Sequence, residues 1–386
     1  MSTLVNQPIS KVRCVDFIFT AFGEGVVNHN GPSKVWNPMA ESSVNNHLFP
    51  KLRGFDPLQR VLHNETGQSL GVSLNDPRIA AAKLVISSEC VRSHLFKDIS
   101  YGITQVTLKN APDVLASLHG LVRGYLITEK DKGSFARKSP LFVTDFECDN
   151  PGLTFNQGTN QKAKIYAPDQ SMYTYYKTGS NLIYKGKASL SIEDLQFIPL
   201  DNTYERSAMG NTNTVLQGQS LASKINEFLS NIDQPFKGRV ANVKFVKNAV
   251  RRNSLSIDGE SGILLDDIAI CIVVDEIIRM FQSLYIRQSK GFMQVDEVIV
   301  DFNDSKKVFR SLKDVHCANP NGTEFAQYYH EVDVDEVKLA EKLANLVAKK
   351  AAQVEDTKLK NETKKNKKNA PKVSKHASPE SKTVSE

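Results

Sequence analysis

Cysteine and histidine are too scattered in this 386-residue chain to build a metal site or a disulfide framework from local spacing. The five cysteines include no CxxC pair, and the eight histidines include neither HxxxH nor HxH. A zinc site therefore has little support, and we expect no metal ion and no other cofactor. We therefore interpret the five cysteines as reduced thiols of a cytosolic protein.

Long apolar runs are also missing. The most apolar stretch, residues 263–286, is interrupted by five charged residues, among them Asp266, Asp267 and Asp275, so it is poorly suited to cross a bilayer. The N-terminal stretch MSTLVNQPISKVR lacks the continuous apolar core of a secretory signal. We therefore expect a cytoplasmic protein with no membrane partner.

Motifs for catalysis are absent as well. The chain has no GxSxG, no P-loop and no dinucleotide-binding glycine pattern, and no cysteine has an obvious activating neighbour. Asp266 and Asp267 form a carboxylate pair, but they precede an apolar helical stretch, so helix capping explains them better than catalysis. We expect no catalytic residue and no enzymatic activity.

The body of the chain has no net charge. Residues 349–386 contain eleven lysines and five acidic residues, whereas the rest of the chain contains 38 basic and 38 acidic residues. An anion-binding site in the body must therefore come from local clustering. We expect residues 333–386 to form a solvated helix at 333–352 and then a disordered basic tail. Three roles remain open for the tail: a nucleic-acid arm, a tether to a partner, or a dispensable segment.

Apolar periodicity indicates an α+β fold. Residues 12–22 alternate as a strand, with Val15, Phe17, Phe19 and Ala21 on one face. The further predicted elements are helices at 87–97, 112–120, 220–232 and 268–286, strands at 121–127, 187–198 and 294–302, and a hairpin at 239–257. Without insertions the order is that of a split βαβ, or ferredoxin-like, core. We expect this RRM-like core to occupy residues 1–332.

Long insertions interrupt the predicted core, at residues 28–82, 149–187 and 237–262. Each is a candidate finger or thumb, because function concentrates in long connections. The glycine-rich stretch GEGVVNHNGP, residues 23–32, leads into the first insertion. From its composition it suits a simple turn, a metal or catalytic site, or a cradle for a phosphate backbone.

Basic residues gather near the ends of the predicted elements. Residues 237–252 contain six basic side chains and no acidic one, although a solvated basic hairpin is the plainer reading. The predicted helix at 87–97 offers backbone N–H groups to a phosphate, and Gly291 permits close approach of a ligand to the backbone. The basic candidates are Arg92, Lys97, Arg137, Lys138, Arg251, Arg252, Arg287 and Lys290. Together they suggest one extended anionic ligand, gripped by its backbone, because the RNP1 pattern for base stacking is not evident.

Several motifs, in this order, resemble one protein family. They are GEGVVNHNGP, FPKLRGF, ISSECVRSHLFKD, GLVRGYLITEK with ARKSPLFVTDF, LSIEDLQFI, VRRNSLSIDGESGILL and IRQSKGFMQVDEVIVDFNDS. Over residues 12–330 the chain closely resembles the backbone subunit of the variant type I-F CRISPR surveillance complex, or Cascade. That subunit belongs to family seven of the Cas proteins, within the RAMP superfamily.

The resemblance implies a non-catalytic ribonucleoprotein subunit of antiviral defence. Copies of such a subunit polymerise head to tail along a CRISPR RNA and hold its spacer for pairing with target DNA. Other Cascade subunits then occupy the filament ends, and a recruited nuclease cuts the target. The resemblance also implies an RRM-like core whose thumb kinks out a base at intervals.

The family's RNA grip carries over to two places in this chain. The first is the helix after the first strand, with Ser88, Arg92 and Lys97, and the second is the glycine loop with Arg287, Lys290 and Gly291. The resemblance places Asn28, His29 and Asn30 beside that helix, where they would hydrogen-bond RNA phosphate or sugar. A structural Asx-type turn is the alternative for these three residues.

Two other functions compete with the filament subunit. One is a RAMP-superfamily endoribonuclease that processes CRISPR RNA, with His29 as general base or with a loop aspartate and a metal ion. The other is a general single-strand-binding protein.

Overall fold

The computed structural model describes residues 11–37, 41–74, 76–129, 133–159, 172–210, 215–254, 258–310 and 324–332. These residues belong to one compact unit, Met1–Val332, and the second unit is Asp333–Glu386. The helix predicted at 333–352 and the basic tail lie outside the described residues.

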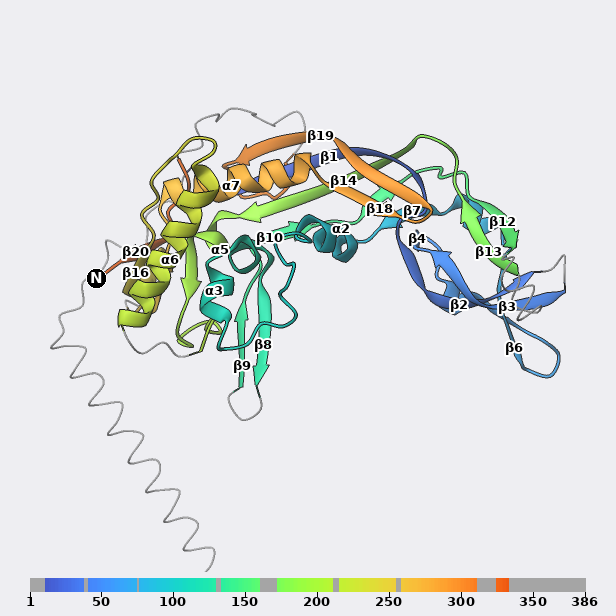
Figure 1. The fold of residues 1–386 in the computed structure, drawn as a ribbon, viewed down its shortest axis with the longest axis horizontal. Helices are drawn as coiled ribbons and strands as arrows, with labels where there is room; N and C mark the ends of the chain where they lie inside the picture. The colour runs from blue at the N-terminus through green and yellow to red at the C-terminus, as the bar shows by residue number, and fades with distance from the viewer. Residues whose placement is uncertain are drawn as a thin grey trace, which may run out of the picture. The chain divides into compact units, whose positions relative to one another are not determined.

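The centre of the described unit is an eight-stranded antiparallel sheet, which is curled (Figure 1). Its strands run in the order β18-β19-β1-β14-β11-β7-β4, and β10 also pairs with β14. The strands are β1 (Cys14–Gly25), β4 (Leu52–Arg53), β7 (Lys83–Ile86), β10 (Leu141–Val143), β11 (Phe146–Cys148), β14 (Leu182–Ser191), β18 (Tyr285–Gln288) and β19 (Gly291–Asn303). The protein is therefore a mixed α/β fold built on an antiparallel sheet.

The inner face of β1 confirms the predicted alternation. Its four predicted residues, Val15, Phe17, Phe19 and Ala21, are all buried. The rings of Phe17 and Phe19 lie 5.0 and 4.6 Å from the ring of Phe281, between centroids. Phe281 belongs to α7 (Asp267–Gln282), which lies along β1 and β19 in Figure 1. Burying these rings together removes a large apolar area from water and fixes α7 on the sheet.

Two of the predicted helix starts are confirmed by their caps. Ser87 Oγ accepts a hydrogen bond from Cys90 N at the start of α2 (Ser88–Leu95). Asp266 Oδ1 accepts one from Ala269 N, at 2.9 Å, at the start of α7. Each cap satisfies a backbone donor that the first helical turn leaves unpaired. Capping thus accounts for Asp266 of the carboxylate pair.

Two predicted strands are partly wrong. The strand predicted at 187–198 ends at Ser191, whose Oγ accepts a hydrogen bond from Asp194 N and caps the short helix α5 (Ile192–Gln196) before β15 (Phe197–Pro199). The strand predicted at 121–127 begins only at Tyr125, because Leu121 and Val122 are both buried in a π-helical turn, η2 (His119–Arg123). The preceding helix, α3, covers Ala111–Leu115, and the strand β8 (Tyr125–Glu129) pairs with β9 (Gly133–Arg137).

The first two insertions form small sheets that pack on each other. Residues 28–82 contain a sheet of order β3-β2-β6-β5, and residues 149–187 contain the hairpin β12-β13. These elements are β2 (His29–Asn37), β3 (Ser42–Pro50), η1 (Pro57–Arg60), β5 (Val61–His63), β6 (Ser69–Ser73), α1 (Pro77–Ala81), β12 (Thr154–Thr159) and β13 (Met172–Lys177). The Phe49 and Tyr176 rings meet edge to face at 5.4 Å, so an aromatic contact joins the two insertions.

The third insertion, residues 237–262, belongs to a second packed sheet of order β15-β17-β16-β20. Its further strands are β16 (Lys244–Arg251), β17 (Glu260–Leu264) and β20 (Tyr329–Glu331). Phe245 of β16 lies directly over Gly218 of α6 (Val215–Asp233), where a Cβ would overlap the ring. Which insertion acts as a thumb stays a prediction. In the described part of the chain, no helix is long and apolar enough to cross a membrane.

Candidate nucleic-acid interface

Two glycines join the segment that leaves β1 to the hairpin β18-β19. Gly25 pairs with Gly291, and a Cβ on Gly25 would overlap the carbonyl oxygen of Lys290. A Cβ on Gly291 would lie 2.7 Å from the carbonyl oxygen of Glu24. Gly25 also has a φ of +73°, which favours glycine. The structure therefore brings residues 23–30 and 287–291 together, at what we call the glycine junction (Gly25 and Gly291).

Lys290, His29 and Tyr175 gather at the glycine junction. Lys290 Nζ lies 3.9 Å from the centroid of the Tyr175 ring, which belongs to β13. Burial and the nearby Lys290 charge lower the pKa of His29, so its imidazole is neutral at pH 7. Burial also lowers the pKa of Lys290. The junction thus offers a cation, an aromatic ring and a neutral imidazole, which suit phosphate, base and ribose contacts.

Sequence reasoning did not find the contribution of the second insertion. Thr178 Oγ1 accepts a hydrogen bond from Gly25 N at 2.9 Å, next in sequence to the strand that carries Tyr175. The aromatic stretch MYTYYK of β13 was the available signal. Residues 172–177 are remote in sequence from both halves of the glycine junction. Only tertiary packing therefore brings this aromatic stretch to the junction.

Asn28 lies beside α2, as the resemblance implied, but its side chain contacts the protein. Asn28 Oδ1 accepts a hydrogen bond from Ser87 N at 3.0 Å, and its carbonyl oxygen accepts one from Lys51 N at 3.0 Å. This geometry gives the Asn28 side chain a structural role, through a contact distant in sequence and not through the Asx-type turn of the alternative. His29 and Asn30 begin β2 and are half-buried.

The N-terminus of α2 is already occupied, which corrects one expectation. Ser88 N donates to Asp145 Oδ1 at 2.8 Å, and Asp145 also forms an ion pair with Arg53. The carboxylate of Glu89 accepts a hydrogen bond from its own backbone N–H, which lowers its pKa. These acceptors are negatively charged, so they take the place that a phosphate would occupy at a helix N-terminus. The expected free N–H groups are therefore not available at Ser87 and Ser88.

Arg92 donates hydrogen bonds to backbone and side-chain acceptors within the protein. Its guanidinium donates to the carbonyl oxygens of Leu141 and Arg123 and to Ser139 Oγ, the last two at 2.7 and 3.1 Å. Burial and the neighbouring Arg123 lower its pKa. This arrangement favours a structural role for Arg92. Lys97, after the end of α2, is exposed, and so is Arg287 on β18.

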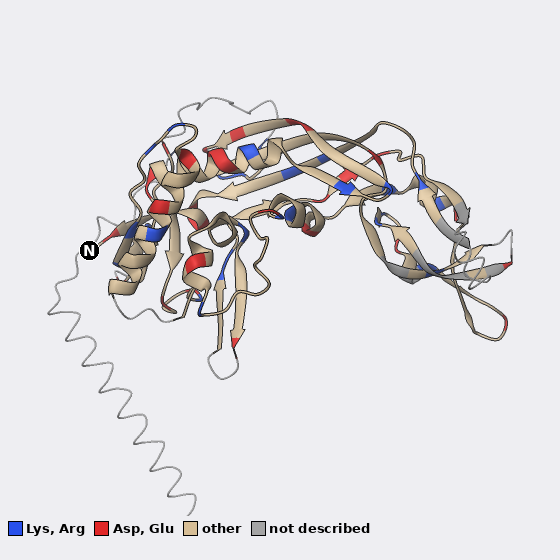
Figure 2. Ribbon diagram, viewed as in Figure 1, with Lys and Arg blue, Asp and Glu red and all other residues tan. Residues whose placement is uncertain are grey.

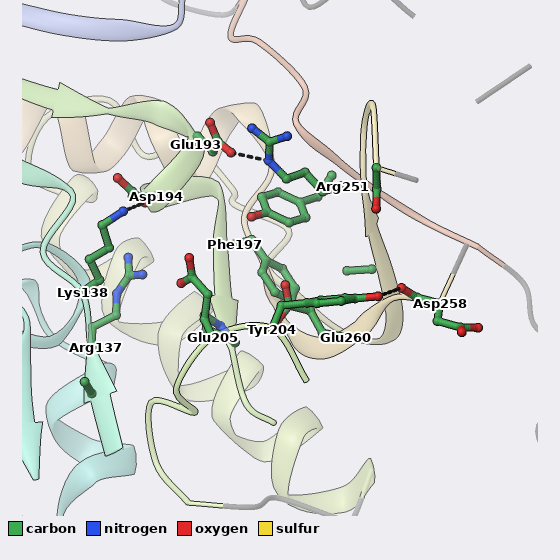
Figure 3. Close-up of a pocket in the computed structure, with 15 residues that line it drawn as sticks. Arg137, Lys138, Glu193, Asp194, Phe197, Tyr204, Glu205, Arg251, Asp258 and Glu260 are labelled. Carbon is green, nitrogen blue, oxygen red and sulfur yellow. Dashed lines mark hydrogen bonds and ion pairs between the residues drawn. The ribbon is translucent and has the colours of Figure 1, made fainter. Parts of the chain in front are cut away.

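Arg137, Lys138 and Arg251 line a cavity of about 420 Å³ that also contains carboxylates (Figure 3). Lys138 Nζ lies 2.8 Å from Asp194 Oδ1, and Arg251 Nε lies 2.5 Å from Glu193 Oε1. Arg137 is only 4% exposed, and burial lowers its pKa to about 10. The backbone N–H of the adjacent Arg252 donates to Tyr328 O. An anionic ligand would meet carboxylates here, so Arg137, Lys138 and Arg251 form a poor phosphate site.

The structure thus separates the predicted residues. His29, Lys290 and Gly291 lie at the glycine junction, Asn28 and Arg92 make hydrogen bonds within the protein, and the cavity holds Arg137, Lys138 and Arg251. Figure 2 shows Lys and Arg interspersed with Asp and Glu along the described ribbon, in agreement with the neutral body. No group of three or more His, Cys, Asp or Glu side chains within the described ranges is placed to hold a metal ion. Contact of any predicted residue with RNA stays a prediction.

Comparison with curated proteins finds no significant match. Comparison with protein families gives a match over residues 11–332, which is most of the chain. The matched family is described as type I-Fv CRISPR-associated protein, Cas7fv-like. The matched range ends where the described unit ends. The chain therefore belongs to the Cas7fv-like family, the Cas7 backbone subunits of type I-F variant Cascade complexes.

Proposed function

We propose that this protein is a non-catalytic subunit that polymerises head to tail along the spacer of a CRISPR RNA and presents it to target DNA. Membership of the family implies a crRNA-binding backbone of a type I Cascade and other Cascade subunits as partners. The observation that carries the proposal for this chain is the glycine junction. There the backbone of two segments, a lysine, an aromatic ring and a neutral histidine converge on one place.

The order of the central strands supports an RRM-like core. In a split βαβ fold, the two strands of each βαβ unit flank a strand of the other unit. Here β1 and β11 flank β14, with α2 between them in sequence. In the same way β14 and β19 flank β1, with α7 between them in sequence. The remaining strands then extend this core on both sides.

The proposal predicts how the protein treats CRISPR RNA. Purified protein should protect the spacer from added nuclease in regular lengths, because each copy covers a fixed segment. Without added nuclease, the RNA should stay intact both with and without Mg²⁺. Denaturing gels of end-labelled RNA measure both properties. Cutting at one site by the purified protein would favour the endoribonuclease alternative, and equal protection of any single strand without regular lengths would favour a general single-strand-binding protein.

The glycine junction should bind phosphates without reading sequence. Lys290→Ala and Arg287→Ala should each weaken binding to unrelated spacers by the same factor, and each should reduce the salt slope of log affinity by about 0.7 for every phosphate that the variant no longer neutralises. Fluorescence anisotropy across a salt series measures the slope. Lys224→Ala is the matched control, since Lys224 is exposed on α6 and pairs with Asp113. Weaker binding to one spacer sequence alone would mean base readout and would contradict this assignment.

A further inference from the structure

The cavity that holds Arg137 is lined by residues of five strands, the short helix α5 and adjoining loops, and it is rich in carboxylates (Figure 3). Arg137 ends β9, Phe197 lies on β15, Arg251 on β16, Glu260 on β17 and Tyr329 on β20. The carboxylates of the lining are Glu193, Asp194, Glu205, Asp258 and Glu260, and the cationic side chains are Arg137, Lys138 and Arg251. Carboxylates therefore outnumber cations in the lining.

Two of the cations are already paired with carboxylates of α5. Lys138 binds Asp194 and Arg251 binds Glu193. The third cation, Arg137, donates from Nη2 to the carbonyl oxygen of Leu121 at 3.1 Å. These contacts leave Glu205 and Glu260 without an ion pair among the described residues. The lining thus has more acidic groups than cationic ones, and Glu205 and Glu260 are among the acidic groups outside the two ion pairs.

Glu260 carries the clearest sign of a missing ligand. It is only 6% exposed, and its Oε2 is buried with no hydrogen-bond donor among the described residues. Burial, with Asp201 and Glu205 nearby, raises its pKa to about 7. A buried acceptor without a partner is costly and uncommon in a native protein, so Glu260 Oε2 calls for a donor that the described residues do not supply.

Arg137 shows the complementary deficiency. Its Nε is buried and has no acceptor among the described residues. A ligand that satisfies both groups must donate hydrogen bonds to Glu260 and also carry an acceptor, such as a carbonyl oxygen. An arginine or lysine residue with its own carbonyl group has this combination.

Aromatic rings complete the lining. Phe197 and Tyr329 stack with centroids 4.6 Å apart, and Tyr204 donates from its hydroxyl to the carbonyl oxygen of Asp258 at 2.6 Å. Aromatic faces next to carboxylates favour guanidinium and ammonium groups, because both interactions attract positive charge. The same lining opposes a phosphate, which would meet Glu205 and Glu260.

We propose that this cavity binds an organic cation, a guanidinium or alkylammonium group that donates hydrogen bonds to Glu260 and lies against the aromatic lining. The cation can belong to a basic residue of a protein or to a free polyamine. The site is separate from the glycine junction and does not depend on the proposed RNA grip. It also gives a reason for the presence of a buried carboxyl oxygen that has no donor in the described part of the chain, since ligand binding would remove its energetic cost.

Isothermal titration of the full-length protein tests the proposal, with N-acetyl-arginine amide and spermidine as separate probes. We expect saturable binding that weakens about tenfold or more in Glu260→Gln and in Glu205→Gln, since each removes a charged acceptor. Glu205 is exposed, so its replacement should leave the fold intact. Glu227→Gln, at an exposed position on α6, is the matched control and should bind as the parent protein does.

The two probes separate the two sources of the cation. Preference for N-acetyl-arginine amide supports a protein side chain as the natural occupant, whereas preference for spermidine supports a free polyamine. Absence of binding by both probes would overturn the proposal. Binding that Glu260→Gln and Glu205→Gln both retain in full would also overturn it, because it would come from general surface charge. Inorganic phosphate should not bind, and phosphate binding that Arg137→Gln abolishes would mean that the cavity is an anion site.

Discussion

Arg92→Ala is expected to lower the free energy of unfolding by about 3 kcal/mol, because it leaves several partly buried acceptors without their charged donor. In the folded protein the Arg92 guanidinium joins α2 to the carbonyl oxygens of Arg123 and Leu141 and to Ser139. Removing it therefore weakens the attachment of α2 to the end of η2 and to the start of β10. Urea unfolding, followed by circular dichroism, measures the change.

Lys97→Ala is the matched control for Arg92→Ala. Lys97 follows the same helix and is exposed, so its removal should change stability by less than about 0.5 kcal/mol. At a low temperature, where the Arg92→Ala variant remains folded, we expect it to bind CRISPR RNA nearly as well as the parent protein does. If instead Arg92→Ala keeps its full stability and binds RNA much more weakly, Arg92 contacts RNA directly and the structural assignment is wrong.

Glu260→Gln is expected to stabilise the protein without added cations by about 3 kcal/mol above pH 7, with the gain disappearing in acid. The pKa of Glu260 rises from 4.5 to about 7 on folding, with burial as the largest cause. Between these values the folded state holds the proton that the unfolded state has released. Stability of the parent protein therefore falls as pH rises through this window, and the loss is complete above pH 7. Glutamine cannot ionise, so the variant avoids the loss.

Urea unfolding of both proteins at a series of pH values measures this difference. The gain should be near zero below the ordinary pKa of 4.5 and should increase until the pH passes about 7. Glu227→Gln should show no such trend, because Glu227 is exposed on α6. A stability gain of Glu260→Gln that is constant with pH would show that folding does not raise the pKa of Glu260. A variant less stable than the parent protein above pH 7 would show the same. Added cation should narrow the difference between the two proteins by about 1.4 kcal/mol for each tenfold by which the parent binds it more tightly.

Local chemistry was sufficient to predict several elements from the sequence. The alternation of Val15, Phe17, Phe19 and Ala21 predicted the buried face of β1, and the helices predicted at 87–97 and 268–286 begin as α2 and α7, capped by Ser87 and Asp266. These features depend on residues that are close together in the sequence, so a short stretch of sequence is enough to predict them. The local signal failed at Ser191, where a cap for α5 interrupts an alternating pattern that would otherwise continue as a strand.

Tertiary structure alone decided what the charged residues do. Sequence reasoning grouped Arg92, Arg137 and Lys290 as one set of basic residues near the ends of the predicted elements. Folding surrounds Arg92 with carbonyl oxygens, buries Arg137 beside carboxylates, and leaves Lys290 against Tyr175 at the glycine junction. A cation's role depends on its burial and on the acceptors within a few ångströms, and most of those acceptors come from elements far away in the chain. The sequence therefore determined the framework of strands and helices, whereas the pairing of distant segments determined the surroundings of each cation.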